Sequence, residues 1–396
     1  MPPSVSTPVR SRGRAATESA ILRSAWTLWS GCGPDGLPLR EVTAGAGCSH
    51  TLVARYFGSK QGLVEAVAAL VATRVDRAVR DAWSTDGDPL EHLLATARED
   101  PVCTRLVVRC GLGDLPSTAL LPAFHLEQLS GLVGARPGAA GRRRLLLAYG
   151  AASMLLGWLT FEDFLVAATE AGRVPPAHLD AGVAAQARSL VDLGRSSRPQ
   201  LRPRRIPPGP SPAGPAGDGA RERLLVAAVA LLAERGPASV SLRDVARRAG
   251  VNLGLIHRHF GSRDALVAAA LEQGSLDLYP GAAAAAGFDL DAVSRVLHAG
   301  SPAPVLIART SVDGIPITRV RPRFPVVAHL LATYPEVPTG AGPGHITDPR
   351  VRAIGVAALA LGSAIWGAPL RAELGLPDAG TDAAVADLAR VLLRPG

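Results

Sequence analysis

The stretch that determines the fold is VSLRDVARRAGVNLGLIHRHFGSRDALV, residues 240–267. Apolar residues recur in it at helical spacing, and Gly250 interrupts the pattern once. Ser241 and Asn252 stand directly before the two apolar patterns, where their side-chain oxygens can accept hydrogen bonds from the first amides of a helix. The stretch therefore predicts two short capped helices joined by a tight turn at the glycine, which is a helix-turn-helix arrangement.

A second copy of this stretch lies earlier in the chain, as LPLREVTAGAGCSHTLVARYFGSKQGLV at residues 37–64. The two copies align without a gap at a shift of 203 residues, and the alignment extends to Ala20–Ala68 on Arg223–Leu271. Self-similarity over this length indicates a duplication within the chain.

The duplication continues into the rest of each half. Residues that recur at shifts of 200 or 205 are Arg109, Pro116, Pro122 and Phe124, as Arg309, Pro316, Pro322 and Phe324, and Gly150, Leu156 and Gly157, as Gly355, Leu361 and Gly362. The repeated unit is therefore a whole half of the chain.

A linker is predicted between the halves, because proline, glycine and arginine dominate residues 196–219 and no apolar period is present there. The predicted division of the chain is a basic disordered arm at 1–13, a first head at 14–72, a first helical domain at 73–195, the linker at 196–219, a second head at 220–275 and a second helical domain at 276–396.

Two long apolar segments, Arg142–Ala171 and Pro349–Leu374, stand at corresponding places in the halves. Aromatic residues make up only 4% of the chain, and frequent Ala and Leu favour an all-α fold of two tandem units. Helices apolar on nearly every face must be buried. Glu162 and Asp163 interrupt the first segment, which argues against membrane spans. We therefore predict that the two segments pack together and join the halves as a pseudo-dimer.

The chain carries a formal net charge of +8, almost all of its basic residues being arginine. This surplus favours an anionic partner such as nucleic acid, although heavy arginine usage can also reflect codon composition. The four cysteines form no CxxC pair, which fits free thiols in a reducing cytoplasm. The N-terminal residues lack the apolar run of a secretory signal, and we find no P-loop, nucleophile elbow or dinucleotide fingerprint. We expect a cytoplasmic, non-enzymatic protein that needs no cofactor.

The second predicted helix of residues 240–267 carries residue types that contact DNA. Asn252 and Gly254 leave the helix start open to base edges and phosphates, and His257, Arg258 and His259 follow within reach of both. Two histidines at this spacing point to different sides of a helix, which disfavours a metal site. The predicted DNA-binding residues of the second head are Ser241, Asn252, Leu253, Gly254, Leu255, His257, Arg258, His259 and Arg263.

The stretch resembles the DNA-binding region of TetR-family transcriptional regulators. The residues that match the family pattern are Ser241, Leu242 to Ala246, Ala249 to Val251, Asn252, Gly254, Ile256, His259, Phe260, Ser262, Arg263 and Leu266. His257 stands where the family usually has tyrosine. The resemblance implies a regulator that acts as a homodimer on a near-palindromic DNA operator, with a helical domain in which a small-molecule effector moves the heads apart.

The first head departs from the pattern in three places. Pro38 stands at the cap, Gly45 lies inside the helix at a cost of about 1 kcal/mol relative to alanine, and Ala54 replaces the family's tyrosine. We therefore expect the first head to bind DNA more weakly or to prefer another sequence. Its predicted DNA-binding residues are Ser49, His50, Thr51, Arg55, Tyr56 and Lys60.

Two further features leave alternatives open. Arg12 and Arg14, in the N-terminal arm, can enter a minor groove or remain in a solvated tail. Arg109 and Arg309 recur in apolar surroundings, where they can pair with an acidic effector or form structural salt bridges, and the second interpretation is favoured because duplication alone explains the recurrence.

The hypothesis that follows is a DNA-binding regulator, a ligand-responsive repressor, whose two unlike heads lie on adjacent major-groove sites about one turn apart and prefer an asymmetric operator. Further homodimerisation of the pseudo-dimer stays open. One alternative is a small-molecule-binding or interaction protein in which one or both heads have lost DNA affinity. Another is an architectural DNA binder with little sequence preference.

Overall fold

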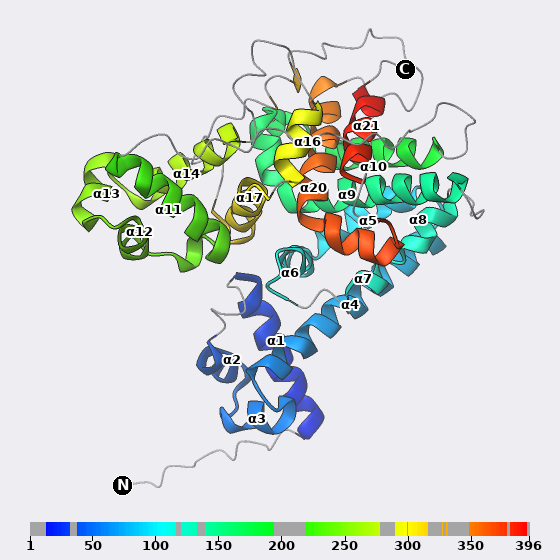
Figure 1. Cartoon of the computed structure of the whole chain (residues 1–396). Coiled ribbons are helices and arrows are strands. Elements are labelled where there is room, and N and C mark those ends of the chain that lie inside the picture. The colour runs from blue at the N-terminus through cyan, green and yellow to red at the C-terminus, as the bar shows by residue number, and fades with distance from the viewer. Residues whose placement is uncertain are drawn as a thin grey trace, which may run out of the picture.

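A computed structural model describes residues 13–31, 38–115, 120–132, 139–193, 219–277, 290–298, 300–315, 327, 330–331, 348–377 and 381–393. Every named element within these ranges is helical (Figure 1), which confirms the all-α prediction. Residues 196–218 of the predicted linker and the N-terminal arm up to Arg12 lie outside the described residues, and Gly219, the last linker residue, directly precedes α11.

The helices of the first half are α1 (Arg14–Gly31), α2 (Leu39–Ala46), α3 (Thr51–Phe57), α4 (Lys60–Ser84), α5 (Pro89–Glu99), α6 (Pro101–Gly111), α7 (Leu120–Ala123), α8 (Leu126–Leu132), α9 (Ala139–Ala168), the short η2 (Ala171–Arg173) and α10 (Pro176–Asp192). Those of the second half are α11 (Ala220–Arg235), η3 (Pro237–Ser239), α12 (Leu242–Ala249), α13 (Leu253–Phe260), α14 (Arg263–Asp277), α16 (Leu290–His298), α17 (Ala303–Val312), α20 (Pro349–Leu374) and α21 (Thr381–Leu393).

Two heads project from a common helical body (Figure 1). The first head, α1 to α3 with the start of α4, forms one lobe, and the second head, α11 to α14, forms another. Helices α6 and α17 lie where the heads meet the body: α6 contacts α1, and α17 contacts α11 and α14. Because α6 and α17 also contact each other, the two attachment points are directly connected.

Helices α9 and α20 pack along each other and join the two halves. Their closest approach is at two recurring glycines, since a Cβ on Gly157 would lie 2.0 Å from the Ala358 carbonyl oxygen and one on Gly362 would lie 1.9 Å from the Ser153 carbonyl oxygen. Only residues without a side chain fit between two backbones at this distance. The recurrence of Gly157 and Gly362 in the sequence therefore marks the crossing point of the pseudo-dimer.

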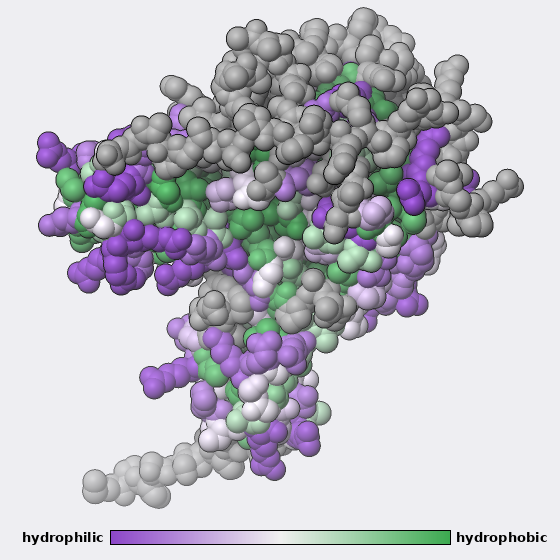
Figure 2. Space-filling model, viewed as in Figure 1, coloured by the Kyte–Doolittle hydropathy of each residue, from purple (hydrophilic) through white to green (hydrophobic). Residues whose placement is uncertain are grey.

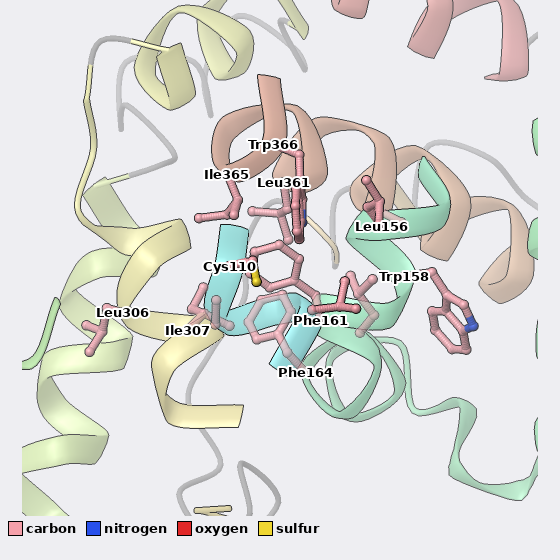
Figure 3. Close-up of a cluster of buried hydrophobic side chains, with 14 of the residues drawn as sticks. Cys110, Leu156, Trp158, Phe161, Phe164, Leu306, Ile307, Leu361, Ile365 and Trp366 are labelled. Atoms are coloured by element: carbon pink, nitrogen blue, oxygen red, sulfur yellow. The ribbon is translucent and has the colours of Figure 1, made fainter. Parts of the chain in front are cut away.

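The core between the halves is built from α6, α9, α17 and α20 (Figure 3). Trp366 of the second half is fully buried, with its ring against Gly111 of α6 and edge-on to Phe124, the two ring centroids being 6.1 Å apart. Its indole Nε1 donates to the Thr160 hydroxyl of α9 over 3.3 Å. Burial of large aromatic side chains at a junction makes the separation of the halves energetically costly.

The predicted long helices are present with small differences. Pro349–Leu374 is α20, as predicted, whereas α9 spans Ala139–Ala168 and so begins and ends three residues before the predicted Arg142–Ala171. The chain leaves α9 early because Glu170 adopts a left-handed conformation with φ of 54°. Two segments, Gly141–Ala168 and Pro349–Leu374, are long and apolar enough to cross a membrane, but 78% of each apolar window is buried inside the protein.

Candidate nucleic-acid interface

The second head contains the two capped helices that the sequence predicts. The Ser241 hydroxyl accepts a hydrogen bond from the Asp244 amide, and the Asp244 carboxylate accepts one in return from the Ser241 amide, which completes a capping box on α12. The Ser241 hydroxyl, which donates to the Asp244 carboxylate over 2.6 Å, and the Ser241 amide together lower the pKa of Asp244. Gly250 ends α12 with a φ of 64°, and the Asn252 side chain accepts from the Gly254 amide at the start of α13. The predicted helix-turn-helix is therefore confirmed.

The outer surface of the second head is basic. Figure 2 shows hydrophilic residues gathered along it. Two of its arginines are held by carboxylates: Arg247 by Asp244, and Arg248 by Glu234 through two hydrogen bonds of 2.8 Å. Within the part of the chain that the structure describes, Arg243 and Arg258 have no carboxylate partner, and both are exposed. Arg243 on α12 and Arg258 on α13 are therefore the arginines of this surface most available to a phosphate or a base.

Most of the predicted DNA-binding residues of this head reach solvent. The exposed ones are Ser241, Asn252, Gly254, His257, Arg258 and His259, while Leu253 and Leu255 are half-buried and pack against the core. The His257 Nδ1 lies 3.3 Å from the Gly261 carbonyl oxygen, so this ring folds back over the end of α13. Arg258 and His259 are exposed, and the His259 ring lies edge-on to Phe260 with the ring centroids 6.4 Å apart.

Arg263 contacts the protein rather than extending into solvent. Its guanidinium turns inward and donates to the carbonyl oxygens of Pro237 and Val240, the second over 3.3 Å, in the segment before α12. Helix ends and turns leave carbonyls without partners, and a charged donor satisfies them well. Arg263 therefore braces the helix-turn-helix from behind, and its contact with the DNA backbone stays a prediction.

The first head has the same helices with weaker caps. Pro38 precedes α2 and makes no side-chain cap bond, as the sequence predicts. Helix α3 begins after His50, also without a cap bond, while the Ser49 hydroxyl lies 2.7 Å from that of Thr51. Gly45 permits a close approach of α2 to α1, because a Cβ there would lie 2.5 Å from the Ser24 hydroxyl. The glycine inside α2 is therefore explained by the close packing of α2 on α1, which the sequence alone does not show.

The other predicted DNA-binding residues of this head are exposed or half-buried. His50, Thr51 and Arg55 are exposed, and Tyr56 and Lys60 are half-buried. Arg14 is the first residue of α1, and its guanidinium lies 5.6 Å from the centre of the Tyr56 ring. This cation–π contact ties the start of α1 to α3. Arg12 lies outside the described residues.

Arg109 and Arg309 are structural, as the favoured interpretation predicts. Both are largely buried, with exposed fractions of 1% and 9%, and both form salt bridges with Asp114. Neither lines a cavity described below.

A partly open, mostly apolar cavity of about 170 Å³ lies within the first half. It is lined by α4, α5, α6, α8 and α9, mostly with aliphatic and aromatic side chains. Its polar exception is an ion pair between Arg74 and Asp100, whose charged atoms are 2.5 Å apart. Cys103 also faces the cavity, and burial raises the pKa of this thiol to about 12. The cavity has no signal in the sequence, because its walls come from the packing of five helices rather than from one stretch of chain.

Arg74 connects the cavity to the first head. Its guanidinium lies 4.6 Å from the centre of the Trp26 ring in α1, while it also holds Asp100 at the junction of α5 and α6. A molecule that displaces Arg74 or Asp100 would therefore alter a direct contact with the head.

Two helix-turn-helix heads on one helical body define the class of protein. The family model for bacterial regulatory proteins of the tetR family matches residues 21–67 and 224–270, and the two segments are related by the same shift of 203 residues as the internal repeat. The chain therefore carries the N-terminal DNA-binding region of the tetR family twice.

Curated relatives come from mycobacteria. The chain is 39% identical over 118 residues to the HTH-type transcriptional repressor Rv3405c of Mycobacterium tuberculosis strain H37Rv, and equally to the HTH-type transcriptional regulators MT3513 of M. tuberculosis strain CDC 1551 and Mb3439c of Mycobacterium bovis. Each match covers 27% of this chain and 55% of the relative, so the chain spans about half the length of the curated relatives it matches.

Proposed function

We propose that this protein is a cytoplasmic, DNA-binding transcriptional regulator in which one chain supplies both heads that bind an operator. The observation that carries this proposal is the second head: a capped α12 and α13, braced by Arg263 from behind, with Arg243 and Arg258 exposed and unpaired by carboxylates among the described residues. A rigid helix with free guanidinium groups is suited to base and phosphate contacts in a major groove. One relative is named a repressor, which supports the same role here.

The two heads contribute unequally to this function. The second head has the capping box and the Asn252 cap, whereas neither α2 nor α3 of the first head has a side-chain cap bond. A missing N-cap costs about 1 kcal/mol of helix stability, so the recognition helix of the first head is less firmly held. The operator is therefore expected to have one strong and one weak half-site.

Replacing Arg258 with alanine should reduce DNA affinity by about 1 to 3 kcal/mol, which is roughly 5- to 150-fold, because it removes a free guanidinium from the recognition helix. The equivalent change in the first head, Arg55→Ala, should have a smaller effect. The measurement is the dissociation constant for duplexes selected from a random library, at fixed salt. Arg235→Ala, which removes the same charge from α11, is the control and should change affinity little.

Equal losses from Arg258→Ala and Arg55→Ala would contradict the inequality of the heads. If no duplex is enriched above the background of the starting library, the protein does not bind DNA specifically, and the interpretation as a binding protein that has lost this activity replaces the proposal. Enrichment without sequence preference, together with a steep salt dependence, would indicate an architectural role.

We further propose that the cavity of the first half binds the effector, an apolar small molecule with one polar group. The apolar walls favour burial of a hydrocarbon or aromatic surface, and the Arg74–Asp100 pair offers the single charged contact. Occupancy would disturb the contact of Arg74 with Trp26 and thus the placement of α1. This response couples the ligand to the first head.

Indole, a small aromatic molecule with one polar N–H group, serves as a probe of the cavity. We expect it to raise the melting temperature of the wild-type chain, since a ligand at 100 times its dissociation constant stabilises the folded state by about 2.7 kcal/mol. Ala78→Trp fills the cavity from a half-buried position of α4 and should abolish the shift. Ala69→Trp, at an exposed position of the same helix, should preserve it. An equal shift in both variants would place indole elsewhere.

A further inference from the structure

A buried cluster of four charged residues lies between the halves. Arg109 donates to Asp114 and to Asp313, each over 3.1 Å, and Arg309 donates to Asp114 over 2.9 and 3.1 Å. The side chains of Arg109 and Asp313 are 1% and 5% exposed. Two of the three pairs therefore join a residue of one half to a residue of the other, in surroundings from which water is almost excluded.

The arginines of the cluster follow the repeat, whereas the aspartates differ by one position: Asp114 stands five residues after Arg109 and Asp313 four residues after Arg309. Arg109 and Arg309 stand in the last turns of α6 and α17, and the amides of Asp114 and Asp313 each donate 2.9 Å to the carbonyl oxygen of the arginine in the same half. Both aspartates are thereby held just beyond a helix end, where their carboxylates cross to the opposite arginine. We call these four residues the ion-pair cluster.

The ion-pair cluster also makes hydrogen bonds to the second head. Arg309 Nε donates 2.8 Å to the Ala233 carbonyl oxygen in the last turn of α11, and the Asp313 carboxylate accepts from the Ala238 amide over 2.9 Å. Between them, Gly236 has a φ of 79°, and a Cβ there would lie 2.6 Å from Asp313 Oδ2. The segment that leads from α11 to α12 therefore packs against the ion-pair cluster at Gly236 and is hydrogen-bonded to the cluster before and after this glycine.

Other ion pairs of the described chain lie within one half. Arg188 pairs with Asp88, and Arg98 pairs with both Glu162 and Asp180, all in the first half. Apolar contacts between α17 and its neighbours are non-directional and allow small displacements. Charged hydrogen bonds are directional, and a displacement would leave buried charges without partners at a high cost. Among the described contacts between the halves, the ion-pair cluster therefore constrains most strongly where the second head lies relative to the first half.

We propose that Arg109, Asp114, Arg309 and Asp313 form a positioning site that fixes the second head relative to the first half of the chain. Because α6 carries Arg109 and also contacts α1, the cluster defines the distance and angle between the two recognition helices. The consequence for DNA, a defined spacing between half-sites, rests on the proposed function. The positioning itself does not, and it can be measured without DNA.

The test measures the distance between the heads in the whole chain. Spin labels are attached to Arg40→Cys on α2 and Arg243→Cys on α12, two exposed and equivalent positions, in a background with Cys32 and Cys48 replaced by serine. The two remaining cysteines are buried, and burial raises the pKa of both thiols to about 12, so they do not take up label at neutral pH. Pulsed electron resonance then gives the distance distribution, which we expect to be narrow.

Asp313→Asn keeps the shape of the side chain but removes its charge, and it should broaden the distance distribution at least twofold. Asp88→Asn is the matched control: it neutralises the carboxylate that pairs with Arg188 in the first half and should leave the distribution unchanged. Arg309→Lys is a second variant, which keeps the charge and loses the paired hydrogen bonds; it should broaden the distribution as well. Circular dichroism verifies that each variant has the helical content of the parent.

A distribution in Asp313→Asn and Arg309→Lys as narrow as in the parent would overturn the proposal, and so would equal broadening in Asp88→Asn. If one variant fails to fold, the other decides. The DNA consequence is read in chains that keep Arg40 and Arg243, from half-site spacing in duplexes selected from a random library: the wild-type chain should select one spacing and Asp313→Asn several. Broadened distances in a chain that selects no DNA would retain the positioning site and refute only the proposed function.

Discussion

Gly362→Ala is expected to lower the free energy of unfolding by about 3 kcal/mol, the upper part of the usual range for overpacking a core. The added Cβ would lie 1.9 Å from the Ser153 carbonyl oxygen and 2.8 Å from the Cα of Gly157. Both contacts are with backbone atoms, which no side-chain rotation can relieve. Helices α9 and α20 would have to separate, and the buried aromatic packing around Trp366 would loosen with them.

Chemical denaturation of the whole chain measures this effect. Gly172→Ala is the matched control, because a Cβ at position 172 meets nothing within 4 Å and this glycine is not in the left-handed region. It should change the free energy of unfolding by less than about 0.5 kcal/mol. Similar denaturation midpoints for the two variants would mean that α9 and α20 do not cross as closely as described.

Separate production of the two halves should give proteins that aggregate or pair with each other. Each half alone would expose the face of α9 or α20 that is now buried. Exposure of roughly 400 Å² of apolar surface costs on the order of 10 kcal/mol, comparable to the whole stability of a domain. When the halves are mixed, or when the intact chain is cut at a protease site inserted between residues 193 and 219, they should elute together from a size-exclusion column.

The control is the intact chain with the same protease site left uncut, which should elute as the parent does. Two halves that each remain monomeric and helical at micromolar concentration would contradict the prediction. Such a result would show that α9 and α20 are each stable in a half without the other, and the pseudo-dimer would lose its energetic basis.

Features encoded locally could be predicted from the sequence almost to the residue. The bounds of α12 and α13 follow from Ser241, Gly250 and Asn252, because a cap or a glycine turn involves only neighbouring residues. The repeat also showed which residues matter in both halves, among them Gly157. Their physical role was not visible, because it depends on which backbone lies opposite.

Features that depend on distant partners escaped the sequence analysis. In the family pattern, Arg263 stands at a position that contacts DNA. In the structure, its guanidinium donates to the carbonyl oxygens of Pro237 and Val240. The salt bridges of Arg109 were predicted, yet their crossing from one half to the other was not, since Asp313 is about 200 residues away. The cavity beside Arg74 is a property of five packed helices and has no linear signature.

The contact between α9 and α20 also changes how the protein responds to its own abundance. Two separate chains must meet before they can cover two half-sites, so their assembled fraction falls steeply on dilution. Partners joined in one chain meet at an effective concentration that does not depend on the number of copies in the cell. Occupancy of an operator by this chain should therefore rise in direct proportion to its copy number at low expression, where a regulator assembled from two subunits would rise with the square.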